Sequence, residues 1–269
     1  MIIQDLVNIL DDAFPPSLQE KYDNTGCQVL FPEDRINSIL LSLDIDSSVI
    51  DEALEKGCNM IITHHPVFFR PIKRLCSGEQ RSDMVIRLLM NRINVYSAHT
   101  NLDKIYNDRL SRALGLKSVN VLFETDSLNN GVTTGFGVMA ETEGPVTLKS
   151  LMDTVKERLS LEYIIYSGSE DSMIRSVAVM NGAGGGQVEK IISENPGVDC
   201  IITGDVGYHS AHFASDNGVS VIDAGHYGTE RVLLGYLKME IMEFLADTEP
   251  SDVIGVHVSG SEKNPFRVY

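Results

Sequence analysis

The sequence predicts an α/β protein built as two lobes, and three observations carry that prediction. Short apolar runs typical of buried strands alternate with amphipathic helical segments, a pattern that in the first lobe favours a mainly parallel sheet. The chain has 269 residues, of which 43 % are hydrophobic, and this suffices for two buried cores. A polar, turn-rich stretch at 126–131 interrupts the alternation. We therefore expect one α/β lobe at 1–125 and a second at 126–269, whose C-terminal segment could return to the first lobe.

The first lobe opens with apolar positions at helical spacing over 3–14, and Pro15 and Pro16 end that helix. Ser47 is a suitable N-cap for the next amphipathic helix. Beyond the opening helix, strands are expected at 39–43, 60–63 and 94–96, and helices at 47–56, 82–91 and 108–114. This order of elements is that of a parallel α/β sheet.

The second lobe repeats the alternation. Strands are expected at 133–140, 163–166, 177–180, 200–203 and 219–222, and helices at 148–159, at 188–193, from about 207, and at 227–245. Two pairs of segments indicate an internal repeat, because 57–63 resembles 197–203 and 95–98 resembles 221–224. Chance similarity between two β-strands is the competing interpretation.

The charge balance bounds the partners and the location of the protein. With 22 basic and 38 acidic residues, the net charge of −16 opposes binding to a nucleic acid or to an anionic membrane surface. The N-terminus has no basic signal-peptide region, and no apolar run reaches the roughly 20 residues of a membrane span. We therefore expect a cytoplasmic protein. The cysteines are scattered, which indicates neither a zinc knuckle nor a disulfide framework; they are Cys27, Cys58, Cys76 and Cys200.

Histidines and carboxylates follow three of the predicted strands. His64 and His65 come directly after 60–63, where a buried strand becomes a loop. Two later strands each lead to a histidine and, four residues on, to a carboxylate on the same face of a helical turn; these pairs are His99 with Asp103 and His226 with Glu230. We expect the three strand ends to converge on one site.

Imidazole nitrogen and carboxylate oxygen together suit zinc, iron, manganese or related divalent ions. The candidate ligands are His64, His65, Asp103, His226 and Glu230. Five such ligands cannot saturate two ions, so water or substrate would fill the open positions, as a catalytic site requires. The alternative for each histidine is a hydrogen bond to backbone at a strand end, but the adjacency and repetition of these residues favour metal.

Other residues near the predicted strand ends carry weaker signals. His99 is a further ligand, a residue that orients a ligand, or a proton donor and acceptor, and we favour proton transfer. Asp205, Tyr208 and His209 could line the same cleft, or Asp205 could be a helix N-cap. The glycine-rich segment 182–186 could cradle a phosphate or form a tight turn. The aromatic and basic residues of 67–74 could hold an anionic, planar substrate or simply pack in the loop.

In order and over almost the whole chain, these segments resemble the GTP cyclohydrolase I type 2 homologue family, also called the NGG-interacting-factor-like family. The matching segments are 23–29, 41–44, 61–66, 97–103, 184–186, 203–205, 223–230 and 264–266. The resemblance implies a two-lobed subunit of related α/β sandwiches with a dinuclear metal site between the lobes, and a ring-like homohexamer. It makes the same five residues the ligands, with Glu230 as the bridge.

The expected function is that of a dinuclear metal-dependent hydrolase that binds two divalent ions per subunit. The family name implies GTP or a related nucleotide as the substrate, with His99 shuttling protons. A metal-dependent phosphoesterase and a non-catalytic metal-binding or partner-binding scaffold protein are the alternatives.

Overall fold

A computed structural model describes residues 1–127, 131–246 and 254–268. The chain forms two compact units: Met1–Leu102 with Leu234–Lys263 is unit 1, and Asp103–Leu233 with Asn264–Tyr269 is unit 2. The first division therefore falls earlier than the expected boundary at 125, because β5 (Lys117–Ser127) pairs with β6 (Thr133–Thr147) of the same unit. Residues 128–130 of the predicted boundary stretch lie outside the described residues.

Unit 1 is built on a five-stranded sheet in the order β1-β4-β3-β2-β11. Three of its strand pairs are parallel, and only β1 runs antiparallel to its neighbour β4. The strands are β1 (Gly26–Val29), β2 (Ser38–Ser42), β3 (Met60–Thr63), β4 (Asn94–Ser97) and β11 (Gly255–Val258). The helices that begin in this unit are α1 (Ile3–Ala13), η1 (Pro16–Leu18), α2 (Ser47–Glu55), α3 (Gln80–Met90) and α4 (Thr100–Ile105), and α10 (Leu233–Ala246) lies almost wholly within it.

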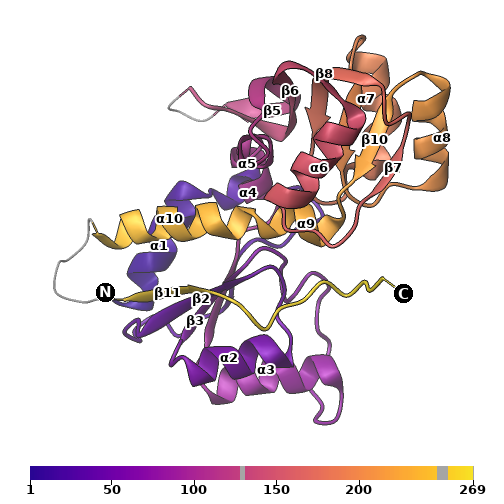
Figure 1. Cartoon of the computed structure of the whole chain (residues 1–269). Helices are drawn as coiled ribbons and strands as arrows, with labels where there is room; N and C mark the ends of the chain where they lie inside the picture. Colours follow the sequence, from indigo (N-terminus) through magenta and orange to yellow (C-terminus); the bar gives the residue numbers. More distant parts are fainter. Residues whose placement is uncertain (128–130, 247–253, 269) are drawn as a thin grey trace. The chain divides into compact units, whose positions relative to one another are not determined.

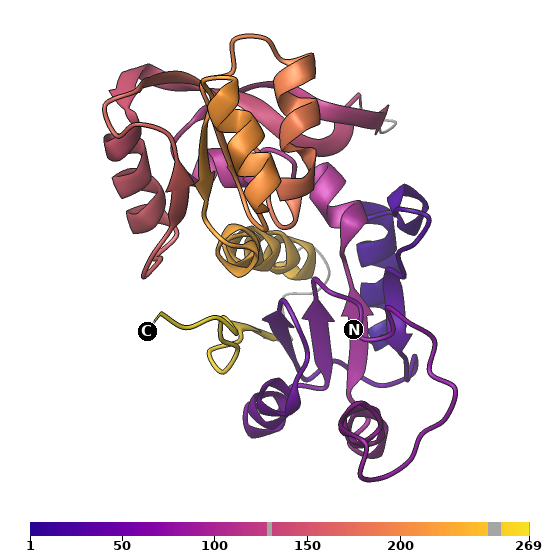
Figure 2. The ribbon, with the colours of Figure 1, turned by 90° about the vertical axis from the view of Figure 1, so that its right-hand side faces the viewer.

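Alternating side chains of the unit 1 strands bury both faces of the sheet. Val95 packs in the cluster formed with α2 and α3, which lie together on one face in Figure 1. The next residue, Tyr96, points to the opposite face, where its hydroxyl donates to Asp11 of α1 at 2.9 Å. In Figures 1 and 2, α10 covers this second face of the sheet, and its Leu237 and Ile241 are buried.

A carboxylate on α2 fixes the closing segment of the chain to unit 1. Glu52 accepts hydrogen bonds from the Ser259 hydroxyl at 2.7 Å and from the backbone N–H groups of Gly260 and Ser261. Lys56 also donates to it at 2.6 Å. Burial alone would raise the pKa of Glu52, but these hydrogen bonds lower it well below its ordinary value of 4.5. The segment that carries β11 is therefore held at its end as well as along its strand.

Unit 2 is built on a six-stranded sheet in the order β5-β6-β8-β9-β10-β7. Its central pairs β8–β9 and β9–β10 are parallel, whereas its outer pairs are antiparallel. The strands not yet defined are β7 (Ile165–Ser167), β8 (Met173–Val179), β9 (Cys200–Thr203) and β10 (Ser220–Asp223). The helices are α5 (Arg109–Ala113), α6 (Leu148–Arg158), η2 (Gly184–Gln187), α7 (Val188–Glu194), α8 (Tyr208–Asp216) and α9 (His226–Arg231).

The two faces of the unit 2 sheet hold separate cores. Cys200 and Ile202 of β9 pack with residues of α5 and α6, while Ile201 between them packs with residues of α7 and α8. This alternation explains the uninterrupted apolar run at β9, because a strand covered on both faces needs no polar side.

The prediction of a mainly parallel sheet in the first lobe is correct. The second lobe is α/β as expected, and its outer strand pairs are antiparallel. The expected N-cap Ser47 is replaced by Asp46, which accepts the backbone N–H of Val49 at 2.9 Å. The single helix expected at 227–245 is divided into α9 and α10. No helix among the described residues has both the length and the apolar character needed to cross a membrane.

Candidate metal centre

Three histidines of unit 1 meet at the carboxyl ends of two neighbouring strands. Because β3 and β4 pair in parallel with Thr63 opposite Ser97, the residues that follow each strand lie at the same edge of the sheet. The ring centroids of His64 and His65 each lie 5.1–5.4 Å from that of His99. One nitrogen of each ring lies within 4.8 Å of the others, a spacing that one cation can span. We call these three residues the histidine cluster.

Each imidazole of the histidine cluster is held through Nδ1. His64 Nδ1 lies 2.8 Å from the backbone oxygen of Ala98, and His65 Nδ1 lies 3.0 Å from Asp44 Oδ1. Since these oxygens can only accept, each Nδ1 carries the proton, and Nε2 becomes the ligand atom. Hydrogen bonds of this kind orient metal-binding histidines in proteins.

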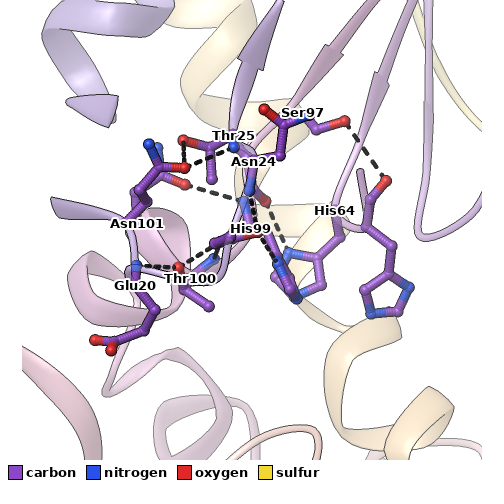
Figure 3. A network of polar contacts seen from close by, with 12 residues as sticks. Glu20, Asn24, Thr25, His64, Ser97, His99, Thr100 and Asn101 are labelled. Carbon is purple, nitrogen blue, oxygen red and sulfur yellow. Dashed lines mark hydrogen bonds and ion pairs between the residues drawn. The ribbon is translucent and has the colours of Figure 1, made fainter. Parts of the chain in front are cut away.

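His99 is held in the same way by Asp23, whose Oδ1 lies 2.8 Å from His99 Nδ1. The other carboxylate oxygen accepts the N–H and the hydroxyl of Thr100. Figure 3 shows His99 beside His64, with Thr100 and Asn101 following it. Burial would raise the pKa of Asp23, but the hydrogen bonds from His99 and Thr100 prevail and lower it to about 2. Asp23 is therefore ionised at neutral pH, and its hydrogen bond fixes the tautomer of His99.

In unit 2, His226 and Glu230 lie one turn apart on α9, with Nε2 and Oε1 3.0 Å apart. Asp205 holds the opposite ring nitrogen of His226 at 2.8 Å, so this imidazole also carries a carboxylate on Nδ1. The hydrogen bond to Glu230, opposed by burial and reinforced by Asp205, raises the pKa of His226 to about 9. A cation entering this pair must therefore displace a proton from Nε2.

Asp103 and Glu230 both adjoin the turn that follows β8. The side-chain amide of Asn181 donates to Asp103 Oδ1 at 2.6 Å. The next residue, Gly182, has φ +62°, and a Cβ there would collide with the Glu230 carboxylate. Its N–H donates to Thr229 Oγ1 at 2.9 Å. This turn therefore positions both expected carboxylate ligands of unit 2.

The donor sets fit divalent metal ions on chemical grounds. Unit 1 offers imidazoles whose proton sits on Nδ1, and unit 2 offers a histidine beside the buried carboxylate of Glu230. Mixed nitrogen and oxygen donors of this kind suit zinc, iron or manganese. The structure thus shows histidine and glutamate groups that could bind metal ions, as the sequence predicted. The identity and number of the ions stay predictions.

Sequence reasoning gave no role to three residues that orient the candidate ligands: Asp23, Asp44 and Asn181. For Asp44 a signal existed. Ser42 of β2 pairs with Thr63 of β3, so the residues two positions further along each strand, Asp44 and His65, must be neighbours. No comparable signal links Asp23 to His99, because they are 76 residues apart and Asp23 precedes its strand.

The other residues singled out near the strand ends differ in what they contact. Asp205 binds His226 and does not cap α8, whose N-cap is Gly207. Tyr208 and His209 are exposed at the start of α8, with ring centroids 5.3 Å apart. In the glycine-rich segment, a Cβ at Gly184 or Gly185 would collide with residues 203–206, so a tight turn explains these glycines.

A separate hollow of about 550 Å3 in unit 1 lies along β1 and α3. Its walls are mainly apolar and include Phe31, Phe68 and Leu89, while Lys73 and Arg74 also line it. It contains none of the histidines. The metal-binding chemistry of unit 1 therefore lies outside this hollow.

Comparison with known proteins identifies the family of the chain. The family described as Duf34/NIF3 (NGG1p interacting factor 3) matches residues 1–265. A Clostridium acetobutylicum protein named GTP cyclohydrolase 1 type 2 homolog is 42 % identical over 231 residues, which are 85 % of each chain. Protein NIF3 homolog of Schizosaccharomyces pombe is 30 % identical over 97 % of this chain and 96 % of its own.

Among solved structures, Staphylococcus aureus protein SA1388 matches with a TM-score of 0.89 and 27 % sequence identity, over 100 % of this chain and 99 % of that one. The fold and the length of the match agree. The predicted family is confirmed, and the chain belongs to the Duf34/NIF3 family.

Proposed function

We propose that this protein is a metal-dependent hydrolase with a dinuclear centre. The residues that would hold the ions are those of the sequence prediction: His64, His65, Asp103, His226 and Glu230. The observation that carries the proposal is the shared orientation of the imidazoles, each with an acceptor on Nδ1 and Nε2 left as the ligand atom. Two bound divalent ions would supply Lewis-acid activation of water.

The residues of the chain have separate roles in this proposal. Asp44 and Asp205 orient the ligand imidazoles through their Nδ1 protons. His99 transfers protons through Nε2. Asp23, whose pKa is about 2, stays ionised and accepts the hydrogen bond of the His99 Nδ1 proton. Asn181 orients Asp103. The expected substrate is GTP or a related nucleotide, supported by the name of the relatives at 30–42 % identity. The expected assembly is a homohexamer, supported by the family resemblance alone.

The metal content of the protein tests the ligand set. Protein purified without chelator should contain about two ions per chain by mass spectrometry, and Glu230→Ala should lose most of them. Glu170→Ala is the matched control, because Glu170 is an exposed glutamate of the same unit whose side chain binds Tyr166. Well-folded native protein that takes up no divalent ion after reconstitution would rule out the hydrolase.

A second experiment tests the reaction. Incubation of the metal-loaded protein with GTP, followed by chromatography, should show a changed nucleotide. Released phosphate with an intact base would reassign the activity to phosphoester hydrolysis. His99→Gln should keep its metal and lose turnover; unchanged turnover would remove His99 from the reaction, and lost metal would make it a ligand.

A further inference from the structure

Two large aromatic side chains are exposed beside the histidine cluster. Tyr22 is 65 % exposed and Phe69 is 46 % exposed. Their ring centroids are 6.4 Å apart, and that of Phe69 lies 6.3 Å from the ring of His99 at an interplanar angle of 79°. Exposed aromatic rings adjoining a polar site are typical of surfaces that a ligand covers. We call Tyr22 and Phe69 the aromatic platform.

Hydrogen bonds hold the backbone on both sides of the aromatic platform. Asp23, next to Tyr22, binds His99, and Asn24 donates to the backbone oxygen of Phe68 at 3.1 Å. The N–H of Phe68 in turn donates to Gln28 at 3.2 Å. The two rings are therefore carried by segments fixed to each other and to His99. The two rings are thus both exposed and held in place, and stacking of a flat ligand requires both properties.

Basic side chains follow the aromatic platform in the sequence. Arg70, Lys73 and Arg74 are exposed in a chain whose net charge is −16. Arg74 pairs with Glu79 at 3.4 Å. Arg70 and Lys73 follow Phe69 by one and four residues, and exposed cations on an acidic protein favour an anionic ligand.

We propose that the aromatic platform stacks a heteroaromatic base next to His99, and that Arg70 and Lys73 bind the phosphate of the same nucleotide. The proposal rests on the proposed function for the reaction that follows binding, but the binding surface is formed by unit 1 residues alone. Aromatic stacking accepts any flat ring, so the platform selects for a base over a plain sugar phosphate. The residues of the histidine cluster would then choose among bases.

Calorimetric titration of the protein as purified tests this surface with three probes: guanosine, GMP and ribose 5-phosphate. Phe69→Leu and Tyr22→Leu should each weaken guanosine and GMP binding about tenfold and leave ribose 5-phosphate unchanged. Arg70→Gln combined with Lys73→Gln should weaken GMP and ribose 5-phosphate and spare guanosine. Leu75→Ala is the matched control, because Leu75 is 45 % exposed in the same loop and has no ring.

Four outcomes would overturn the proposal: no guanosine or GMP binding by the native protein, no loss in Phe69→Leu and Tyr22→Leu, an equal loss for ribose 5-phosphate, or an equal loss in Leu75→Ala. Thermal unfolding of each variant identifies losses that come from misfolding, and the more conservative Phe69→Tyr should restore stacking. Guanosine binding by Glu230→Ala separates this proposal from the proposed function. Retained binding with lost metal supports the platform, whereas native metal content without guanosine binding removes the platform and leaves the metal centre.

Discussion

The strand ends that carry the candidate ligands share a backbone hydrogen bond in unit 1 and unit 2, but their side chains differ. Ala98 donates its N–H to Thr63 in unit 1 at 2.8 Å, and Ala224 donates to Thr203 in unit 2 at the same distance. A carboxylate also orients a histidine in each unit, as Asp44 binds His65 and Asp205 binds His226, but Asp44 follows β2 whereas Asp205 follows β9, the counterpart of β3. The segments that suggested an internal repeat therefore occupy equivalent places in their sheets.

The difference lies in what the common backbone presents. After the first strand of the repeat, unit 1 has His64 and His65, whereas unit 2 has Gly204 and Asp205. Unit 1 thus supplies imidazoles, while the same position in unit 2 supplies the carboxylate that orients His226. The comparison teaches that the same strand arrangement can carry different metal-binding groups. The residues just beyond the strand are imidazoles in unit 1, and in unit 2 they include a carboxylate.

The largest effect should come from the tight turn beside Glu230. Gly182→Ala places a Cβ against the Glu230 carboxylate in a left-handed conformation, so we expect loss of metal and a stability loss of about 2 kcal/mol. Gly57→Ala in unit 1 is the control, because Gly57 has φ +66° with open space around it. It should cost only about 1 kcal/mol and keep the metal. Equal metal loss in both variants, measured by mass spectrometry, would contradict the packing argument.

Substitution of the orienting carboxylates tests whether the histidines of the two units contribute equally to zinc affinity. Asp44→Asn and Asp205→Asn should each weaken zinc affinity by about 10- to 100-fold, because the amide can present its NH2 to Nδ1 and favour the wrong tautomer. Competition with a chromophoric chelator measures both affinities. If only one variant loses zinc affinity, the two units do not contribute equally, and the zinc is bound by the unit that carries that substitution.

The smallest effect concerns the closing segment of unit 1. Glu52→Gln should lower the free energy of unfolding at pH 7 by about 1 kcal/mol, because it weakens charge-assisted bonds to residues 259–261. The pKa of Glu52 is lowered on folding, so its contribution is full above its ordinary value of 4.5 and declines as the pH falls below that value.

Urea unfolding at pH 7 and at pH 3 checks this prediction, and the difference between native protein and variant should shrink at the lower pH. Lys56→Met is the control, because a half-exposed ion pair contributes only about 0.5 kcal/mol. A difference that grows on acidification would reverse the assigned role of Glu52.

The sequence predicted the central strands well and the edge strands poorly. The predicted strands at 60–63 and 200–203 have the observed bounds, because both are continuous apolar runs buried on two faces. The sheet edges are β1 and β11 in unit 1 and β5 and β7 in unit 2. Three of these were not predicted and β7 was displaced, since an edge strand shares its surface with solvent and carries a weak apolar pattern.

The types of ligand in the candidate site could be predicted from the sequence, but the residues that hold those ligands in place were harder to predict. Imidazoles at strand ends are visible in a sequence, and the structure does bring together His64, His65 and His99, as well as His226 and Glu230. The bond between Asp23 and His99 depends on the antiparallel pairing of β1 with β4, which no local pattern announces. Whether all five predicted ligands bind metal stays a prediction.

The discontinuous make-up of unit 1 has a consequence for the order of events on the ribosome. Residues 103–233 form a contiguous piece of unit 2, which can collapse as soon as it emerges. The first sheet must wait, because the β2 edge gains its partner β11 only when residues 255–258 are synthesised. Until then β2 presents unpaired backbone groups, so the sheet that begins first is completed last and is the more exposed to aggregation during translation.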